Sequence, residues 1–600
     1  MLARHYSAWI AACLLLGCAT APVPREAGFE AAAHDPWAAL AAGDFRSARA
    51  GFEQLRATSG REQEGLAGLL SLAQTTADDP AVLKLLESAD PASASGLLAV
   101  TAAEAALDLR PLPPRSRDLA ARACAFKADA KLGDRAKSAC SWLPLVSNRS
   151  ALERCTAGCS ASTRLGMFFA GNQPVVLASV NGLAEAAFIV DTGASTSVLT
   201  RSFAAQAKVE MLPGTELEAQ AAGGTIATGR ALVSFKTGAV TVEDVPVALI
   251  DLPIDSIAGI IAPQATWRQF AVDLDFHSFA AVLSPSPAAG PALIAVPYLR
   301  HESRPALLLE TAGRPPRPIV LDTGAFHTTL DADWEALGPP LEHVRETRAA
   351  GAGGQGSRGW ITRAEVAARA GEFSWTMHNP SILEGKHQSE GPLRSVGLLG
   401  MDLMMGRHLV LDVPRRKMWL SGTAALPDWP VGSSTVWRIK MEGLAAPVLV
   451  TEKLVERSGE SVTLEISYSH PQGDRHFRLQ MPETWDTRGT WLIGRPATKL
   501  WDLSGGQPKE LDPKQAAGFW LPVFFSFKTV AAKTSPRIRF DMVDLGGQKT
   551  ACTTIVLPAE AAKAAAELAM TSCPSDPWRT RHLTLTDSDG RVLWDVDRKQ

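Results

Sequence analysis

The chain contains 600 residues, of which 46% are hydrophobic and 20% are charged, and it carries a formal net charge of -3. This composition is typical of a globular protein and excludes both a disordered chain and a protein with many membrane spans. At roughly 150 residues per domain, the length predicts about four domains. The 60 basic and 63 acidic residues balance, so the charge gives no reason to expect a nucleic-acid partner.

The N-terminal residues have the pattern of an export signal. Arg4 and His5 precede an apolar run, residues 8–16, that is too short to span a bilayer as a stable helix. The run ends in LLGC at 15–18, which resembles the lipobox of bacterial lipoproteins. The resemblance implies that the signal peptide 1–17 is removed, that Cys18 carries a lipid, and that residues 18–34 form a tether. An ordinary secretory signal with an incidental cysteine is the alternative.

Residues 35–160 are predicted to form an α-helical region. Apolar residues recur there at helical spacing, with a short turn at Gly43-Asp44 between two helices: Leu40, Phe45, Ala48, Phe52 and Leu55. The segment resembles half of a tetratricopeptide-type repeat, although no regular period of about 34 residues follows it. A peptide-binding repeat and an irregular helical spacer are therefore equal alternatives.

Six cysteines remain once the signal peptide is removed and Cys18 is set aside. An even number in an oxidising compartment favours disulfides. Proximity along the chain predicts the pairs Cys124–Cys140, Cys155–Cys159 and Cys552–Cys573. A zinc site is the rival interpretation, but no cysteine pair has a two-residue spacing with a second ligand pair nearby.

From about residue 165 the chain changes to short apolar runs with β-branched residues and glycine-containing turns, which predicts strands. A Pro/Ser/Ala-rich stretch at 284–291 predicts a linker between two units, 161–286 and 287–424. Farther on, the alternation of Val462, Leu464 and Ile466 with polar residues indicates a β-rich domain at 430–600. Inside it we expect one helix over about 558–570 and a hairpin at Asp589-Gly590.

The two units on either side of the linker repeat each other. FIVDTGA at 188–194 matches IVLDTGA at 319–325, and a turn glycine lies nine positions before each aspartate, at Gly182 and Gly313. An Ala-Gly-Gly or Gly-Ala-Gly-Gly stretch follows about thirty positions after each aspartate. GIIA at 259–262 corresponds to GLLG at 397–400. One such motif arises easily by chance, but two with matching surroundings do not.

These motifs resemble retropepsin-like aspartic proteases, with two lobes joined in one chain as in the pepsin-type enzymes. The resemblance covers about residues 165–421 and implies that Asp191 and Asp322 are the catalytic pair. It also implies two flaps over the cleft, one around Gly223-Gly224 and one at 351–359 that contains Gly353 and Gly354.

Elementary chemistry supports this assignment. Gly193 and Gly324 lack a Cβ, so backbone N–H groups can approach the carboxylates, and the hydroxyls of Thr192 and Thr323 can bond across the lobe interface. Two carboxylates about 3 Å apart cannot both ionise, so the pair shares one proton. The ionised partner then takes a proton from a water molecule that attacks the peptide carbonyl, and the protonated partner hydrogen-bonds the carbonyl oxygen.

The residues after the two glycines indicate the working pH. Ala194 and Ala325 stand where acid-acting relatives often carry Ser or Thr, and the missing hydroxyl donors predict a higher pKa for the pair. We therefore expect an optimum nearer neutral than strongly acidic.

The repeat is imperfect at one position, and a few nearby residues invite other interpretations. Ala262 stands opposite Gly400, and we expect its methyl group to be accommodated without displacing Asp191.

His327 is better explained as a strand residue than as an acid or base, and Trp360 either covers the cleft or packs within a strand. GAGGQG at 351–356 spells a dinucleotide-binding fingerprint without the strand–helix context that such a site needs.

The sequence thus predicts a mainly β protein with a two-lobed, aspartic protease-like β-barrel core, an α-helical N-terminal region and a β-rich C-terminal domain. The expected activity is hydrolysis of a polypeptide substrate by an aspartic endopeptidase that uses no metal and no organic cofactor. We expect a monomer with intrachain lobe pairing, no nucleic-acid partner and a lipid anchor as its only membrane contact. The resemblance to bacterial lipoproteins implies, through Ala19 after the lipobox, the periplasmic side of the outer membrane rather than the inner membrane. The alternatives are a peptide-binding or assembly lipoprotein with a weak or inactive site, and lobes that pair with another chain.

Overall fold

The computed structural model describes most of the chain after its N-terminal segment. The described residues are 35–129, 132–146, 152–170, 173–221, 224–252, 256–286, 293–351, 354–384, 392–422, 430–442, 446–458, 461–469, 473–482, 497–512, 527–529, 537–545, 548–561, 564–573 and 580–599. The predicted signal peptide, Cys18 and the tether, together with Gly223, Gly353 and the linker residues 287–291, lie outside the described residues.

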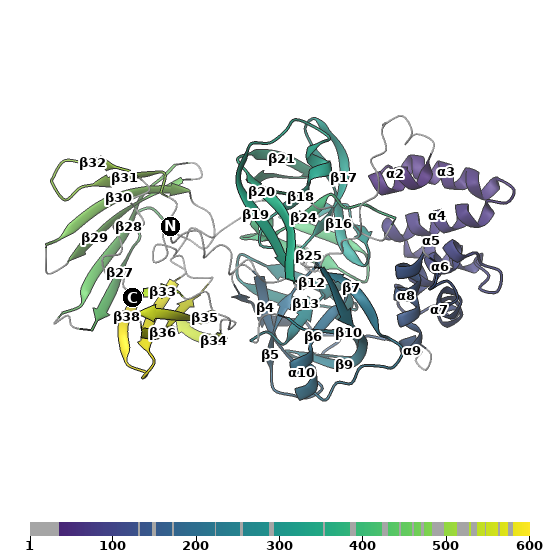
Figure 1. Ribbon diagram of the computed structural model, residues 1–600, viewed down its shortest axis with the longest axis horizontal. Coiled ribbons are helices and arrows are strands. Elements are labelled where there is room, and N and C mark those ends of the chain that lie inside the picture. Colours follow the sequence, from purple (N-terminus) through teal and green to yellow (C-terminus); the bar gives the residue numbers. More distant parts are fainter. Residues whose placement is uncertain are drawn as a thin grey trace.

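The described chain is mainly β and has three parts in sequence order, namely a helical part, two β lobes and a C-terminal sheet. Figure 1 shows the helices against one side of the lobes and the C-terminal strands on the other side. This arrangement confirms the predicted fold class. Among the helices of the described residues, none combines the length and apolar character needed to cross a membrane.

The helical part contains eight short helices. They are α2 (Pro36–Ala42), α3 (Phe45–Ala57), α4 (Glu62–Thr75), α5 (Asp79–Glu87), α6 (Gly96–Leu107), α7 (Ser116–Cys124), α8 (Gly133–Ser141) and α9 (Leu143–Val146). The predicted turn lies between α2 and α3, where Gly43 has a φ of 82° and the Asp44 carboxylate caps α3 by accepting from the Ser47 N–H. Leu40 and Phe52 are buried, as their spacing predicts.

The first lobe is built on an eight-stranded sheet. Its elements are β1 (Arg154–Ala157), β2 (Thr163–Gly166), β3 (Phe168–Ala170), β4 (Gln173–Val180), β5 (Ala186–Val190), β6 (Ser197–Thr200), α10 (Arg201–Gln206), β7 (Leu217–Ala221), β8 (Gly224–Thr228), β9 (Arg230–Thr237), β10 (Val240–Ile250), β11 (Gly259–Ile261), α11 (Pro263–Thr266), β12 (Ala271–Asp275) and β13 (Ala280–Ser284). Strands β1, β3–β6 and β9–β11 make the sheet, while β7 and β8 pair separately as a hairpin.

The second lobe repeats this plan on a ten-stranded sheet. Its elements are β14 (Leu293–Val296), β15 (Leu299–His301), β16 (Arg304–Thr311), β17 (Arg314–Leu321), β18 (Thr329–Asp331), α12 (Ala332–Glu335), β19 (His343–Gly351), β20 (Gly354–Thr362), β21 (Glu365–Ala370), β22 (Phe373–His378), β23 (Ser381–Leu383), β24 (Gly397–Leu399), α13 (Met401–Met404), β25 (His408–Asp412) and β26 (Lys417–Ser421). Here β19 and β20 form the hairpin that corresponds to β7 and β8.

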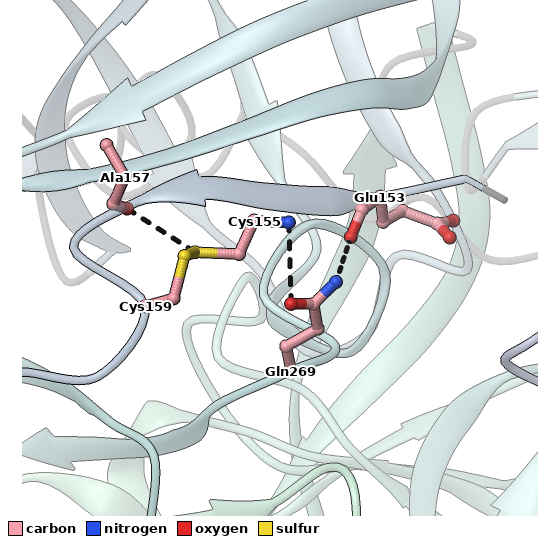
Figure 2. The surroundings of a disulfide bond; sticks show 5 residues. All are labelled: Glu153, Cys155, Ala157, Cys159 and Gln269. Atoms are coloured by element: carbon pink, nitrogen blue, oxygen red, sulfur yellow. Dashed lines mark hydrogen bonds between the residues drawn. A yellow bond between two sulfur atoms is a disulfide. The ribbon is translucent and has the colours of Figure 1, made fainter.

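The helical part ends earlier than the predicted residue 160. Strand β1 pairs antiparallel with β10 and so belongs to the sheet of the first lobe. Gln269 holds β1 in place, since its amide nitrogen donates to the Glu153 carbonyl at 2.6 Å and its amide oxygen accepts from the Cys155 N–H at 3.4 Å (Figure 2). The first lobe therefore begins before residue 161. The short β1 segment has no apolar alternation, so only its pairing partner shows that it is a strand.

A six-stranded sheet joins the two lobes. Its order is β14-β26-β25-β12-β13-β2, so each lobe supplies three strands. The two halves meet where β12 pairs antiparallel with β25, with Asp275 opposite His408. Backbone hydrogen bonds between β12 and β25 thus join the two lobes.

The C-terminal part is a twelve-stranded sheet. Its strands are β27 (Ser434–Met441), β28 (Val448–Ser458), β29 (Ser461–Ser469), β30 (Arg475–Pro482), β31 (Lys499–Asp502), β32 (Lys509–Leu511), β33 (Phe527–Thr529), β34 (Arg537–Leu545), β35 (Gln548–Ala561), β36 (Ala564–Ser572), β37 (Thr580–Asp587) and β38 (Val592–Lys599). The alternation predicted for 462–466 is confirmed in β29, and Asp589-Gly590 lies in the turn between β37 and β38.

The helix predicted over 558–570 is wrong, because this segment forms parts of β35 and β36. The two strands pair antiparallel along their length, and β36 pairs in turn with β37. Alanines favour a helix in isolation, but strand partners on both sides override that weak preference.

All three cysteine pairs expected from proximity form disulfides in the structure. The bonds join Cys124 to Cys140, Cys155 to Cys159, and Cys552 to Cys573. The last of these joins Cys552 in β35 to Cys573, the residue that follows β36, outside the segment 558–570.

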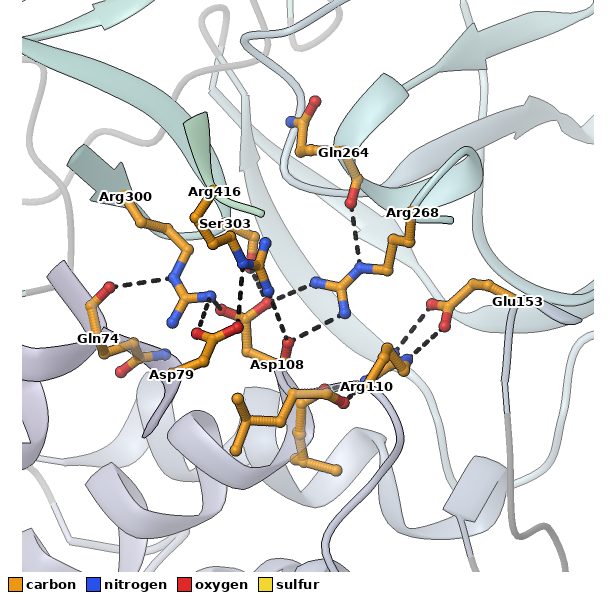
Figure 3. Close-up of polar contacts among 12 residues, drawn as sticks. Gln74, Asp79, Asp108, Arg110, Glu153, Gln264, Arg268, Arg300, Ser303 and Arg416 are labelled. Carbon is orange, nitrogen blue, oxygen red and sulfur yellow. Dashed lines mark hydrogen bonds and ion pairs between the residues drawn. The ribbon is translucent and has the colours of Figure 1, made fainter. Parts of the chain in front are cut away.

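A buried network of charges fastens the helical part to both lobes (Figure 3). The Asp108 carboxylate, at the end of α6, lies 2.6 Å from Nη2 of Arg268 in the first lobe and 2.7 Å from Nη1 of Arg300 in the second. Arg416 of the second lobe adds a bond to Asp79 at 3.2 Å. Burial alone would raise the pKa of Asp108, but the charges of the three arginines outweigh it and hold that pKa well below its usual range.

We predict that Asp108→Asn destabilises the protein by roughly 3–5 kcal/mol, because it leaves buried guanidinium groups without their carboxylate. Since the folded pKa of Asp108 is depressed, its stabilisation is present above the unfolded pKa and is lost as the pH falls below about 4. Urea unfolding at several pH values measures both effects.

The matched control is Asp134→Asn, which removes an ion pair to Lys137 whose side chains are 64% and 59% exposed. It should change the free energy of unfolding by about 0.5 kcal/mol or less. Equal effects of the two substitutions would show that the buried network does not fasten the helices.

Candidate active site

Each lobe presents one aspartate at the end of a buried strand. Asp191 follows β5 and Asp322 follows β17, and in both lobes a short strand, β11 or β24, runs parallel beside it. The Asp191 N–H donates to the Ile261 carbonyl and the Asp322 N–H donates to the Leu399 carbonyl, both at 2.9 Å. The repeated sequence therefore folds into two equivalent loops.

The two loops bring their carboxylates together in one buried site. Asp191 is 1% exposed and Asp322 is 3% exposed, and their side chains are hydrogen-bonded to each other. A Cβ added to Gly193 would lie 2.3 Å from Cγ of Asp322, and one added to Gly324 would lie 2.6 Å from Cγ of Asp191. Each glycine thus leaves the space that the carboxylate of the opposite lobe occupies.

Two threonines join the loops by reciprocal hydrogen bonds. The Thr192 hydroxyl donates to the Leu321 carbonyl at 2.7 Å and accepts from the Thr323 N–H at 3.0 Å. The Thr323 hydroxyl donates to the Val190 carbonyl at 2.7 Å and accepts from the Thr192 N–H at 3.0 Å. All four bonds are buried, so they hold the aspartates at a defined separation.

Backbone N–H groups orient each carboxylate. Oδ1 of Asp191 accepts from the N–H groups of Gly193 at 2.7 Å and Ala194 at 3.1 Å. Oδ1 of Asp322 accepts from the N–H groups of Gly324 at 2.8 Å and Ala325 at 3.1 Å. These bonds use the Oδ1 atoms, so the Oδ2 atoms remain available to the partner carboxylate or to a substrate.

The carboxylates have unequal electrostatic surroundings. Burial raises the pKa of Asp322 well above its usual value, and the neighbouring charge of Asp191 and the hydrogen bond to it add to the increase. Burial also raises the pKa of Asp191, but the hydrogen bond from Asp322 and the N–H groups of Gly193 and Ala194 offset part of that increase. Asp322 therefore holds a proton more readily than Asp191 and is the donor of the hydrogen bond between them.

Two glutamines support the loops, and the sequence analysis missed both. The Gln264 amide donates to the carbonyls of Thr192 at 3.1 Å and Ala194 at 2.7 Å, and the Gln173 amide donates to the Gly324 carbonyl at 2.7 Å. Gln264 is detectable from the repeat, because it occupies the place that Asp402 takes in the second lobe. Asp402 bonds instead to the Thr328 N–H and hydroxyl, at 2.8 and 2.9 Å.

The structure accommodates Ala262 as expected. This residue is fully buried, and its N–H donates to the Ser197 hydroxyl at 2.9 Å. In the second lobe a Cβ on Gly400 would lie 2.4 Å from the backbone carbon of His327, so glycine is required there. Since the Asp191 N–H keeps its bond to the Ile261 carbonyl, the extra methyl group does not disturb the first loop.

The predicted flaps are β-hairpins. Gly224 begins β8 and Gly354 begins β20, whereas residues 222–223 and 352–353 lie outside the described residues. The described residues of the dinucleotide-like stretch, Gly351 and 354–356, lie in the paired strands β19 and β20. Trp360 lies within β20 and stacks on His343 with ring centroids 5.7 Å apart, which makes it a strand residue.

His327 is exposed and lies in the loop before β18, so the expectation that it is a strand residue is wrong. Burial raises the pKa of the neighbouring Asp402 carboxyl, and its interaction with His327 offsets part of that increase. The structure thus places His327 beside a carboxylate that is separate from the Asp191–Asp322 pair. In the described part of the chain, no group of three or more His, Cys, Asp or Glu side chains could hold a metal ion.

Comparisons with known proteins agree with this site. Residues 176–262 and 309–403 match the family model of aspartyl proteases, so each matched segment contains one of the two aspartates. A search of curated proteins found no match.

Similar solved structures include conglutin gamma from lupine seeds, at 13% identity and a TM-score of 0.27, and basic 7S globulin from soybean, at 12% identity and a TM-score of 0.26. Each likeness covers 44% of this chain and 95% of the other. The two lobes of the chain are thus similar in sequence to aspartyl proteases.

Proposed function

We propose that the protein is an aspartic endopeptidase that hydrolyses peptide bonds with water activated between Asp191 and Asp322. The observation that carries the proposal is the buried, hydrogen-bonded carboxylate pair, held by two equivalent loops. The match of both lobes to the aspartyl protease model supports it.

The geometry gives each carboxylate a role. Ionised Asp191 takes a proton from the attacking water, and protonated Asp322 donates its proton to the carbonyl oxygen of the substrate as charge develops there. The backbone N–H groups on both Oδ1 atoms fix the directions of these transfers before the substrate arrives.

We further propose that the enzyme works as a monomer in a bacterial envelope, with a lipid on Cys18 as its anchor. The lipobox-like LLGC at 15–18 supports the anchor, and the three disulfides suit an oxidising compartment. Metabolic labelling with a palmitate analogue tests the anchor, because Cys18→Ser should abolish incorporation.

We predict that Asp191→Asn and Asp322→Asn each lower kcat/KM by about three orders of magnitude, because each removes one of the two proton-transfer groups. Cleavage of a denatured-protein mixture, followed by mass spectrometry, measures this loss. Asp251→Asn is the control, since this aspartate of the first lobe has an 81% exposed side chain. Equal activity in all variants, or no wild-type cleavage over a broad pH range, would favour a peptide-binding protein.

The raised pKa values predict the pH profile. Activity needs one proton on the pair, so it falls when Asp191 gains a proton at low pH and when Asp322 loses its proton at high pH. Since both pKa values are raised, both limbs shift toward neutral pH. Ala194→Ser adds a hydroxyl donor beside Asp191 and should move the acidic limb of kcat/KM downward. An enzyme most active below about pH 3 would contradict the prediction.

Thr323→Val is expected to destabilise the protein by roughly 2–4 kcal/mol, because it leaves the Thr192 N–H and the Val190 carbonyl buried without a partner. Thr323→Ser restores the hydroxyl and should recover most of the loss. Chemical denaturation compares the two, and equal stability of the Val and Ser variants would show that the cross-lobe bonds are unimportant.

A further inference from the structure

A cavity of about 480 Å³ lies where the helical part meets the lobes. Its walls include α8, the residues Ser195 and Thr196 that follow the Asp191 loop, and Leu217 and Thr228 at the base of the first hairpin. Asp191 and Asp322 do not line it, but Ser195 and Thr196 lie only four and five positions after Asp191 in the chain. The lining residues thus connect the cavity to the Asp191 loop and to the base of the first hairpin.

Most cations that line this cavity are paired with a carboxylate. The pairs are Arg110 with Glu153, Arg135 with Glu104, Lys137 with Asp134, and Arg268 and Arg300 with Asp108. Each of these five cations lies within ion-pair distance of a carboxylate, although Arg268 and Arg300 share that of Asp108.

Arg230 is different. It is 8% exposed, its Nε donates to the Ser141 hydroxyl at 2.9 Å, and its guanidinium lies 4.5 Å from the ring centroid of Trp142. Its two terminal nitrogens have no hydrogen-bond or carboxylate partner among the described residues. Burial lowers the pKa of Arg230 to about 10, so it remains charged at neutral pH.

We propose that this cavity is a carboxylate-binding subsite of the substrate cleft, in which the terminal nitrogens of Arg230 bind an acidic group of the polypeptide. A planar guanidinium whose Nε is already fixed presents two parallel N–H donors, which match the two oxygens of a carboxylate. A ligand carboxylate would also compensate a buried charge that the described chain leaves unpaired.

The position of Arg230 connects the subsite to the proposed catalytic loops. Arg230 begins β9 two residues after Thr228, the last residue of the first hairpin. Ser141 and Trp142, which hold its side chain, come from α8 and the residue that follows it. The helical part thus completes a site at the hairpin base that the lobes alone would leave open.

This inference rests on the proposed peptidase function, since it names the substrate feature that the enzyme selects. The acidic group has two possible sources, an Asp or Glu side chain and the C-terminal carboxylate of a peptide. Both present the same two oxygens to the guanidinium, so the experiment must separate them.

The test measures binding apart from cleavage. Fluorescent decapeptide pools with a fixed central Glu or Gln, each with a free or an amidated C-terminus, are titrated against full-length Asp322→Asn protein by fluorescence anisotropy. We expect roughly ten- to a hundredfold tighter binding of a pool that carries the recognised carboxylate. A Glu-over-Gln difference identifies the side chain as the source, and a difference between free and amidated pools identifies the C-terminus.

Substitutions of Arg230 attribute the preference to this residue. Arg230→Gln should remove it, and Arg230→Lys, which keeps the charge without the fork, should retain part of it. The matched control is Arg314→Gln, because Arg314 also stacks on a tryptophan, 4.0 Å from the Trp334 ring centroid, but does not line the cavity. Thermal unfolding of each variant confirms that the comparison is made on folded protein.

The outcomes separate the two proposals. Equal binding of all pools, or a preference that persists in folded Arg230→Gln protein, would overturn the subsite. Carboxylate-selective binding that depends on Arg230, combined with no cleavage by the wild-type protein, would overturn the peptidase proposal and keep the subsite. In an active enzyme, cleavage sites mapped in a denatured-protein mixture should show the same acidic preference, and Arg230→Gln should lose it.

Discussion

Reciprocal hydrogen bonds between Thr192 and Thr323 set the geometry at the centre of this molecule. Each hydroxyl bonds to the backbone of the opposite lobe, and no water competes with these bonds because both threonines are fully buried. The bonds place the two aspartate loops face to face and force two carboxylates into contact in a desolvated site. Burial raises the pKa of both carboxyl groups, and the enforced contact raises that of Asp322 further while it lowers that of Asp191, which is the basis of the proposed acid–base chemistry.

The two aspartate loops have matching backbone hydrogen bonds, but different side chains support them. Gln264 holds the first loop through two carbonyls, whereas Asp402 in the matching place bonds to Thr328 of the second. The two carboxyl groups also differ in pKa, because burial and the neighbouring charge of Asp191 raise that of Asp322 well above its usual value. An uneven pair suits a reaction in which one group accepts a proton while the other donates one.

The helical part contributes to the site through its attachment to both lobes. Asp108 bonds to Arg268 of the first lobe and Arg300 of the second, so the helices are fastened across the seam between them. The same attachment closes the cavity that contains Arg230. If that cavity binds an acidic group, the helices supply specificity to a catalytic centre to which they contribute no reacting atom.

The sequence by itself determined the site and the architecture to a large extent. The duplicated Asp-Thr-Gly motif identified both loops, because close approach of two carboxylates demands glycine, and a hydroxyl must follow the aspartate for the loops to bond. Alternating apolar residues in 461–469 predicted β29, and the spacing of Leu40 and Phe52 predicted the first helices, since local periodicity reports which face is buried.

Only the tertiary structure decided features that depend on distant partners. Residues 558–561 and 564–570 are strands because β35 and β36 pair with each other and β36 also pairs with β37, and β1 is a strand because β10 lies beside it. Gln173 and Arg230 look ordinary in sequence, since a side chain gains its role from the carbonyl or the cavity that folding brings to it. Local pattern specifies which faces are buried and where the chain turns, but the partner of a buried polar group comes from elsewhere in the chain, and only the folded protein shows it.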